Sequence, residues 1–302
     1  MKELSIDFMG QRKFAAGLSV VLLLVSLASL AVRGLSFGLD FTGGALVEVS
    51  YQQPADLDAT RELLESAGFE DPVVQNFGTD REVLIRLQQD NSPTLGDQVV
   101  DAIVQAGFDV ELQRSEYVGA QVGDELRDQG GLGLLFALIV VMFYVAVRFQ
   151  YKFSLGSVAA LIHDVILVLG IFSLMGWDFD LTVLAAVLAV IGYSLNDTIV
   201  VSDRIRENFR TVRVGNSTEI INLSINQTLG RTLVTSLTTI LVLLALLFLG
   251  GELIRGFAAA LLVGVFVGTY SSIYVAANVL MALNIDRADL LPPEVEVEDD
   301  RP

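Results

Sequence analysis

The chain of 302 residues contains no cysteine and a single histidine. Oxidation outside the cytoplasm therefore cannot cross-link it, and no cysteine-based metal or redox site is possible. Lysine is also absent between residues 34 and 131, where 19 Asp and Glu stand against 5 Arg. Because this segment is strongly acidic, it is not expected to bind nucleic acid or anionic lipid headgroups, which are also negatively charged. It fits a solvated surface or a surface that binds a basic partner or an unfolded chain.

What the chain does have is apolar sequence, because 53% of its residues are hydrophobic and they cluster in long runs. A helix needs about 20 residues to cross roughly 30 Å of hydrocarbon. Runs of about this length occur at 14–32, 132–148, 155–175, 181–201, 233–249 and 257–283. We therefore predict an α-helical polytopic membrane protein with six transmembrane helices.

The first apolar run resembles either a cleaved signal peptide or a permanent anchor. Lys2, Arg12 and Lys13 precede it, and Ser26 with Ala28 offers a cleavage-type pattern of small residues. Its apolar core of about 19 residues is longer than the roughly 7 to 15 of a signal peptide. We expect an uncleaved anchor.

Basic residues near the ends of the runs predict the orientation, because Lys and Arg accumulate in cytoplasmic segments. With the N-terminus inside, only Arg33, Arg127 and Arg255 lie near a membrane end on the outer side. The cytoplasmic side then holds Lys2, Arg12, Lys13, Arg148, Lys152, Arg204, Arg206, Arg210, Arg213, Arg231 and Arg287. The predicted regions are a cytoplasmic N-terminus (1–13), a first transmembrane helix (14–33), a periplasmic domain (34–131), a five-helix transmembrane region (132–284) and an acidic cytoplasmic tail (285–302).

The predicted periplasmic segment is long enough for a small domain. Strands are expected at 45–51, 72–77, 82–87 and 109–118, and helices at 55–67 and 94–106. The strands alternate apolar and polar residues, and each helix ends at a glycine, Gly68 or Gly107. The order βαββαβ predicts a small α+β domain of the ferredoxin-like type.

Polar side chains in the fourth run are the first candidates for a functional site. A charge at the centre of a bilayer costs about 2.5 to 3.5 kcal/mol on insertion scales, so carboxylates are rare there unless function needs them. Asp197 lies about 24 Å along this helix from Leu181. Asp203 stands near the rim in the run DRIREN, where a solvated helix end explains it. Asn196 and Asp197 have no such explanation.

Two neighbouring helices offer possible partners for Asp197. Arg231 stands where the fifth span begins, and it can form a buried ion pair that fixes helix register. Alternatively, Asp197 takes up and releases a proton while Arg231 tunes its pKa. In the third span, His163 and Asp164 fit either a proton relay or a hydrogen bond between helices.

Two sets of small residues complete the candidates. In GLDFTGG, the glycines Gly38, Gly43 and Gly44 permit tight turns, and Asp40 with Thr42 can hydrogen-bond exposed backbone. We interpret this stretch as a hinge and docking corner between membrane and outer domain. In the sixth span, small residues at four-residue spacing indicate close helix packing without chemistry; they are Ala260, Gly264 and Gly268.

Three long motifs carry a resemblance to a known family. They are GLDFTGG at 38–44, VIGYSLNDTIVVSDRIRENFR at 190–210 and NQTLGRTLVTSLTT at 226–239. The sequence resembles the SecD/SecF protein-export family of the resistance-nodulation-division superfamily over nearly the whole chain before the acidic tail. The resemblance implies a subunit in the bacterial inner membrane that works with SecD. It also implies the SecYEG translocon, YajC, YidC and the translocating preprotein as further partners.

Within that family, proton flow through the membrane domain drives movements of the outer domains that promote late, ATP-independent steps of export. The resemblance implies that Asp197 and Arg231 conduct protons and that a second aspartate belongs to SecD. The chain has no nucleotide-binding signature, which agrees with an ion gradient as the energy source. A carboxylate can serve Na⁺ as well as H⁺, so the coupling ion stays open. The resemblance implies a transport subunit rather than an enzyme, with no cofactor.

Two other classes of function fit the sequence less well. A small-molecule exporter of the same superfamily needs two six-helix halves and much larger outer domains to form a drug pocket. An intramembrane aspartyl protease would use Asp164 and Asp197, but such chemistry requires carboxylates a few ångströms apart. The motif NDTIV lacks a second aspartate in a matching context, and Arg231 would keep a carboxylate ionised.

Overall fold

The computed structural model describes residues 6–87 and 94–290. Within these residues, six helices are long and apolar enough to cross a membrane. They are α1 (Arg12–Val32), α5 (Ala120–Arg148), α6 (Tyr151–Met175), α7 (Leu181–Thr211), α8 (Ser217–Leu249) and α9 (Glu252–Ala282). Each contains most or all of one predicted run. We call them the membrane helices. The predicted acidic tail from residue 291 onward lies outside the described residues.

Several membrane helices extend beyond the predicted runs. α5 begins at Ala120 rather than at residue 132, so the segment 120–131 belongs to this helix. α8 begins at Ser217, where Asn216 accepts a hydrogen bond from the backbone of Glu219 and the Glu219 side chain accepts one from the backbone of Asn216. Hydropathy locates the part of a helix that is compatible with hydrocarbon, whereas the backbone stays helical until a cap satisfies its free groups.

A separate α+β domain follows α1. Its elements, in chain order, are β2 (Gly44–Tyr51), α3 (Leu57–Ser66), β3 (Val73–Phe77), β4 (Thr79–Leu87), α4 (Leu95–Gln105) and β5 (Val110–Val118). The strands pair antiparallel in the order β3-β4-β2-β5. These elements confirm the predicted order of strands and helices.

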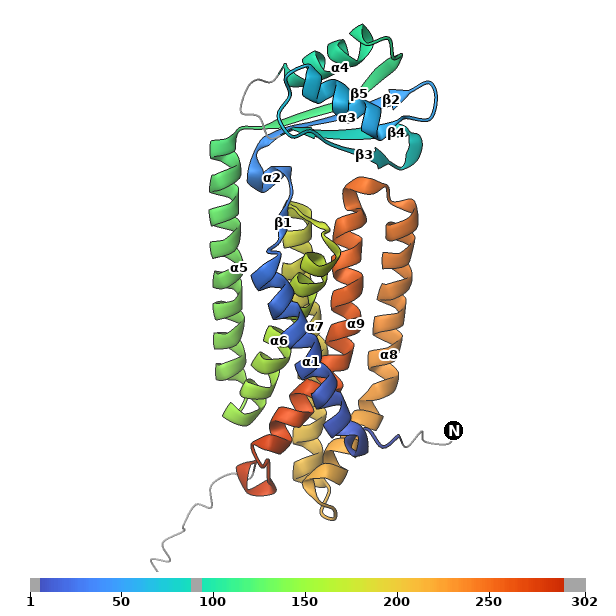
Figure 1. The fold of residues 1–302 in the computed structure, drawn as a ribbon. Helices are drawn as coiled ribbons and strands as arrows, with labels where there is room; N and C mark the ends of the chain where they lie inside the picture. The colour runs from blue at the N-terminus through green and yellow to red at the C-terminus, as the bar shows by residue number, and fades with distance from the viewer. Residues whose placement is uncertain (1–5, 88–93, 291–302) are drawn as a thin grey trace, which may run out of the picture.

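The core of this domain lies between the sheet and its two helices, which cover one face of the sheet (Figure 1). Alternate residues of β2, namely Ala45, Val47, Val49 and Tyr51, are buried in this core. The opposite face looks toward the ends of the membrane helices (Figure 1). A cleft of about 850 Å³ separates the two, and its lining includes Leu46 and Leu84 of the sheet. An ion pair between Arg86 and Asp178 bridges the domain to the connection between α6 and α7.

The junction between the domain and the membrane helices is built from short elements. They are β1 (Ser36–Phe37), α2 (Leu39–Thr42) and β6 (Asp178–Phe179), and β1 pairs in parallel with β6. Phe41 and Phe179 stack with ring centres 6.0 Å apart. This contact joins the connection after α1 to the connection between α6 and α7.

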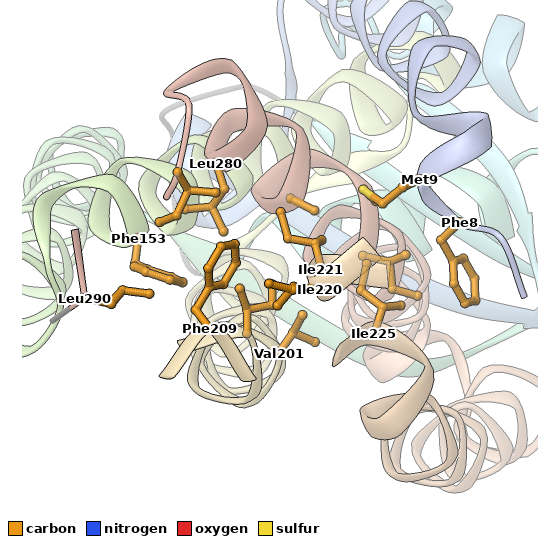
Figure 2. Packing of buried hydrophobic residues seen from close by; sticks show 14 of the residues in the cluster. Phe8, Met9, Phe153, Val201, Phe209, Ile220, Ile221, Ile225, Leu280 and Leu290 are labelled. Atoms are coloured by element: carbon orange, nitrogen blue, oxygen red, sulfur yellow. The ribbon is translucent and has the colours of Figure 1, made fainter. Parts of the chain in front are cut away.

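Helix α9 is the centre of the membrane bundle, because it packs against α6, α7 and α8. An apolar cluster fills the bundle end remote from the sheet, and Figure 2 shows Phe153, Phe209 and Leu280 within it. Phe8 and Leu290 belong to the same cluster, so both ends of the described chain lie there. They are held by two short 3₁₀ helices, η1 (Met9–Gln11) and η2 (Arg287–Asp289).

Candidate functional site

Asp197 lies where three membrane helices meet. Its side chain comes from α7 and is only 8% exposed. Thr232 of α8 donates a hydrogen bond of 2.8 Å to Oδ1, and Ser272 of α9 donates one of 2.5 Å to Oδ2. Both donors are neutral hydroxyls. Hydrogen bonds of this kind favour the ionised carboxylate, whereas removal from water favours the neutral acid.

The small residues of α9 allow this meeting of helices. A side chain at Gly264 would overlap Val190 of α7, and a Cβ at Gly268 would stand 3.1 Å from the Cβ of Ser194. Ala260 is fully buried in the same interface. The face predicted from its spacing therefore lies against α7, and close backbone approach brings short serine side chains within reach of the carboxylates.

Arg231 and Asn196 lie on exposed parts of the helix surfaces. Among the described residues, no ion pair within 4.0 Å joins Arg231 to Asp197, although its charge acts on the carboxylate through space. The structure therefore does not contain the buried ion pair that was one alternative for Asp197. Asp203 is exposed, and its nearest basic partner is Arg206 at 3.4 Å.

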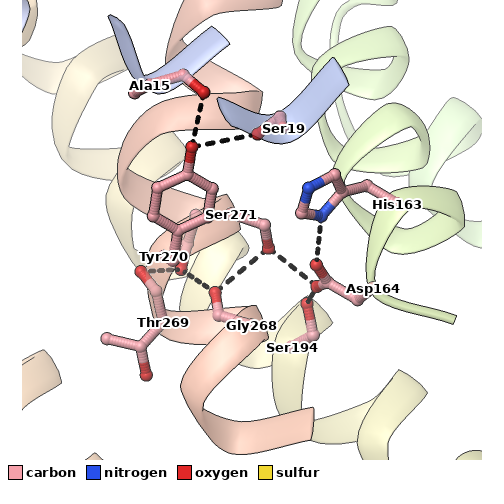
Figure 3. A network of polar contacts seen from close by, with 10 residues as sticks. Ala15, Ser19, His163, Asp164, Ser194, Gly268, Thr269, Tyr270 and Ser271 are labelled. Carbon is pink, nitrogen blue, oxygen red and sulfur yellow. Dashed lines mark hydrogen bonds and ion pairs between the residues drawn. The ribbon is translucent and has the colours of Figure 1, made fainter. Parts of the chain in front are cut away.

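His163 and Asp164 form a second buried polar cluster (Figure 3). Nδ1 of His163 lies 2.9 Å from Oδ1 of Asp164. Oδ2 of Asp164 accepts hydrogen bonds from Ser194 of α7 and from Ser271 of α9, the latter 2.7 Å long. Nε2 of His163 is buried and has no hydrogen-bond partner among the described residues. No hydrogen bond in the described part of the chain links Asp164 to Asp197.

Tyr270 connects this second cluster to α1. Its ring stacks against the imidazole of His163, with ring centres 6.1 Å apart. Its hydroxyl lies 2.6 Å from the carbonyl oxygen of Ala15, to which it donates, and 3.0 Å from the hydroxyl of Ser19 (Figure 3). The first helix is thus tied by polar contacts to α9, whose serines donate hydrogen bonds to both carboxylates.

The GLDFTGG stretch forms a packed corner. Gly38 donates its backbone N–H to the carbonyl of Phe179, and Oδ2 of Asp40 accepts a 3.0 Å bond from the backbone N–H of Leu181. Thr42 donates its hydroxyl to the carbonyl of Gly38. Asp40 therefore satisfies one of the free amides at the start of α7, the helix that carries Asp197.

The two glycines that end this stretch are required by their backbone geometry. Gly43 has φ 70° and ψ 175°, and Gly44 has φ 116°. A Cβ at Gly43 would stand 2.7 Å from the Cα of Ala120, at the start of α5. Only glycine combines this backbone conformation with so close a neighbour.

Sequence reasoning missed the serines that contact the carboxylates. It assigned the sixth span to packing alone, whereas α9 supplies Ser271 to one carboxylate and Ser272 to the other. The available signal was their spacing, three and four residues after Gly268 on the same helix face. Within residues 6–87 and 94–290, no group of three or more potential metal ligands is present.

Comparisons with known proteins agree with the motifs. Residues 98–286 match the family described as protein export membrane protein SecD/SecF, C-terminal, and residues 28–55 match the SecD/SecF GG motif. The protein translocase subunit SecF of Pseudomonas aeruginosa is 53% identical over 99% of this chain and 98% of its own length. The same subunit of Vibrio alginolyticus is 49% identical, over 98% of this chain and 95% of its own length.

Solved structures extend the likeness to three dimensions. A crystal structure of SecDF from Thermus thermophilus, described as a translocon-associated membrane protein, superposes with a TM-score of 0.85 at 38% identity. A super-membrane-facing form of SecDF gives a TM-score of 0.71 at 37% identity. This chain is covered to 93% and 94%, but it spans only 39% of each SecDF chain.

Proposed function

The chain belongs to the SecF family of protein translocase subunits, and we propose that it couples proton movement through its membrane helices to late, ATP-independent steps of protein export. In this proposal, Asp197 takes up and releases the proton. Arg231 sets the electrostatic field around it, and Asn196, Asp164 and His163 belong to the same pathway. The relatives are named as protein translocase subunits, which favours this function over small-molecule export.

The buried carboxylate of Asp197 carries the proposal. It is enclosed among membrane helices, and its only hydrogen bonds among the described residues come from two hydroxyls. A carboxylate that merely fixed helix register would be expected to form an ion pair, because an unpaired buried charge is costly. A group that must exist in both protonation states is better served by neutral donors, which tolerate the acid and the anion.

SecD is the partner that we propose first. The SecDF chains are more than twice as long as this chain, which matches 39% of each. A separate SecD chain would supply a second half, including a second carboxylate for the proton route. The solved SecDF is described as translocon-associated, which supports our proposal of contact with the SecYEG translocon. We propose the preprotein as a further partner on the family resemblance. We extend the proposal to YajC and YidC on the family resemblance alone.

We also propose an orientation. The chain is a multi-pass inner-membrane protein, and the distribution of Lys and Arg favours cytoplasmic termini. The α+β domain would then be periplasmic, within the limits 34–131. Its βαββαβ order and strand order β3-β4-β2-β5 support a ferredoxin-like domain. The corner around Gly38 to Gly44 would act as the hinge through which helix movement reaches this domain.

The deciding experiment replaces Asp197. Asp197→Asn keeps the size and a hydrogen-bonding group but cannot bind and release a proton. We expect normal expression and assembly with SecD, and loss of the stimulation of export by a pH gradient in membrane vesicles. Asp203→Asn is the matched control, because it removes an exposed carboxylate from the same helix and should leave stimulation intact. Gradient-dependent export at the wild-type rate in Asp197→Asn would refute the proposal.

A further inference from the structure

The hydroxyl of Ser272 has more acceptors than it has protons. Its Oγ lies 2.5 Å from Oδ2 of Asp197 and 2.6 Å from the carbonyl oxygen of Gly268, one turn earlier in α9. Serine carries one O–H and can donate one strong hydrogen bond at a time. The two contacts are therefore alternatives. Thr232, the other donor to Asp197, has no second acceptor among the described hydrogen bonds.

The choice between these acceptors depends on the charge of Asp197. An ionised carboxylate accepts only, and a hydrogen bond to a charged group is stronger than one to a neutral carbonyl. Ser272 then donates to Asp197. A protonated Asp197 can itself donate to Oγ of Ser272, which frees the serine proton for the carbonyl of Gly268. Ser272 loses no proton in this exchange, because its O–H only rotates.

Close packing fixes the serine in this position. Ser272 is completely buried, and at Gly268 the two helices are so close that an added Cβ would stand 3.1 Å from the Cβ of Ser194 on α7. The adjacent Ser271 is also completely buried and lies 2.7 Å from Asp164 and 3.1 Å from the same Gly268 carbonyl. One backbone carbonyl of α9 is thus shared by the serines that serve the two carboxylates.

We propose that Ser272 is a positioning residue for proton transfer: its hydroxyl turns between Asp197 and the Gly268 carbonyl and so reports the protonation of Asp197 to the backbone of α9. The inference rests on the proposed role of Asp197. Protonation of Asp197 on α7 would thereby be coupled, through Ser272, to α9, the helix that also contacts α6 and α8.

Other titratable groups around this switch are few. From α8, the charge of Arg231 acts on Asp197 through space. From α6, Asp164 reaches α9 at Ser271, and His163 contacts Asp164. On α9 itself, Tyr270 is the neighbour of the serine pair, and its hydroxyl is directed to α1. Helix α5 carries no Asp, Glu, Lys, Arg or His between residues 129 and 147.

The test compares Ser272→Ala with Ser173→Ala in the full-length chain assembled with SecD. Ser173 is a buried serine of α6 whose hydroxyl, among the described residues, bonds only to Ser29, so its variant measures the loss of a buried hydroxyl away from the carboxylates. Two readouts are taken in each variant. One is the pH profile of gradient-dependent export. The other is the infrared C=O band of protonated Asp197, identified as the band that Asp197→Asn lacks.

Ser272→Ala should change both readouts, and Ser173→Ala should change neither. Loss of one of two donors to the ionised carboxylate should displace the export profile toward higher pH by about one unit, a tenfold change in the protonation equilibrium. The Asp197 band should change frequency, because its neighbouring hydroxyl is gone. Ser272→Thr retains the O–H and should restore the wild-type profile and band.

Four results separate the possible failures. A wild-type profile and band in Ser272→Ala overturn the switch while leaving the role of Asp197 intact. Equal displacements in Ser272→Ala and Ser173→Ala show a packing effect and also overturn it. If Ser272→Ala does not assemble, Ser272→Cys replaces it, and an unchanged band with this weak donor counts against the proposal. Normal export in Asp197→Asn defeats the proposed function itself.

Discussion

Replacement of Gly43 by alanine tests whether the GLDFTGG corner holds the α+β domain against the membrane helices. The backbone at Gly43, with φ 70° and ψ 175°, lies in a region that only glycine enters readily. Holding another residue there costs about 1 to 3 kcal/mol. The added Cβ would also stand 2.7 Å from the Cα and 2.9 Å from the N of Ala120, which are backbone atoms that cannot rotate away. Such overpacking costs about 1 to 3 kcal/mol more.

The expected destabilisation of the Gly43→Ala variant is therefore about 2 to 6 kcal/mol. This is large compared with the free energy of unfolding of a typical domain, which is roughly 5 to 15 kcal/mol. We expect the corner to open before the rest of the chain unfolds. The single tryptophan, Trp177, directly precedes β6, which pairs with β1 just before this corner and accepts a hydrogen bond from Gly38, so its fluorescence during heating reports the event. Hydrogen exchange at the amide of Leu181, which bonds to Asp40, gives an independent readout.

Gly68→Ala is the matched control for this experiment. Gly68 also has a positive φ, of 95°, but nothing lies within 4 Å of its Cβ position. The Gly68→Ala variant is therefore destabilised by the strained backbone conformation but not by a steric clash. If Gly43→Ala and Gly68→Ala lower the melting temperature equally, and the Leu181 amide stays protected, the collision with Ala120 does not matter. The reasoning about a docked corner would then be wrong.

Two further predictions concern helix ends. Asp40→Ala removes the acceptor for the Leu181 amide and should cost about 1 kcal/mol, seen as faster hydrogen exchange at that amide, whereas Asp40→Asn retains an oxygen acceptor and should not. Near the end of the described chain, the hydrogen bond that Lys152 at the start of α6 donates to Asp289 of η2 lowers the pKa of Asp289 from its ordinary 3.8. The stabilisation by this pair is therefore complete above pH 3.8 and is lost as pH falls below it. Proteolysis of the C-terminal segment should accelerate below pH 3.8 in the wild type, and Asp289→Asn should show no such acid-dependent step; an acid step that persists in the variant would contradict the assignment.

The sequence alone was sufficient for the elements that depend on local pattern. A run of apolar residues long enough to cross a bilayer predicts a helix wherever it occurs, because backbone groups in hydrocarbon must bond within their own segment. Likewise, alternating apolar and polar residues and the glycines after the helices predict the α+β domain without knowledge of any tertiary contact. Asp197 was identified because an isolated carboxylate in an apolar run is costly wherever the helix packs.

Only the tertiary structure decided what surrounds that carboxylate. Arg231 looked like its partner in sequence, yet its side chain lies on an exposed face of α8, whereas Thr232, one residue further, points at Asp197. A shift of one residue turns a helical side chain by about 100°, and hydropathy does not say which face meets which helix. Ser272 could not be identified from the sequence for the same reason. Serine is a common packing residue in membrane helices, and its contact with Asp197 depends on how α9 packs against α7, which is close at Gly268.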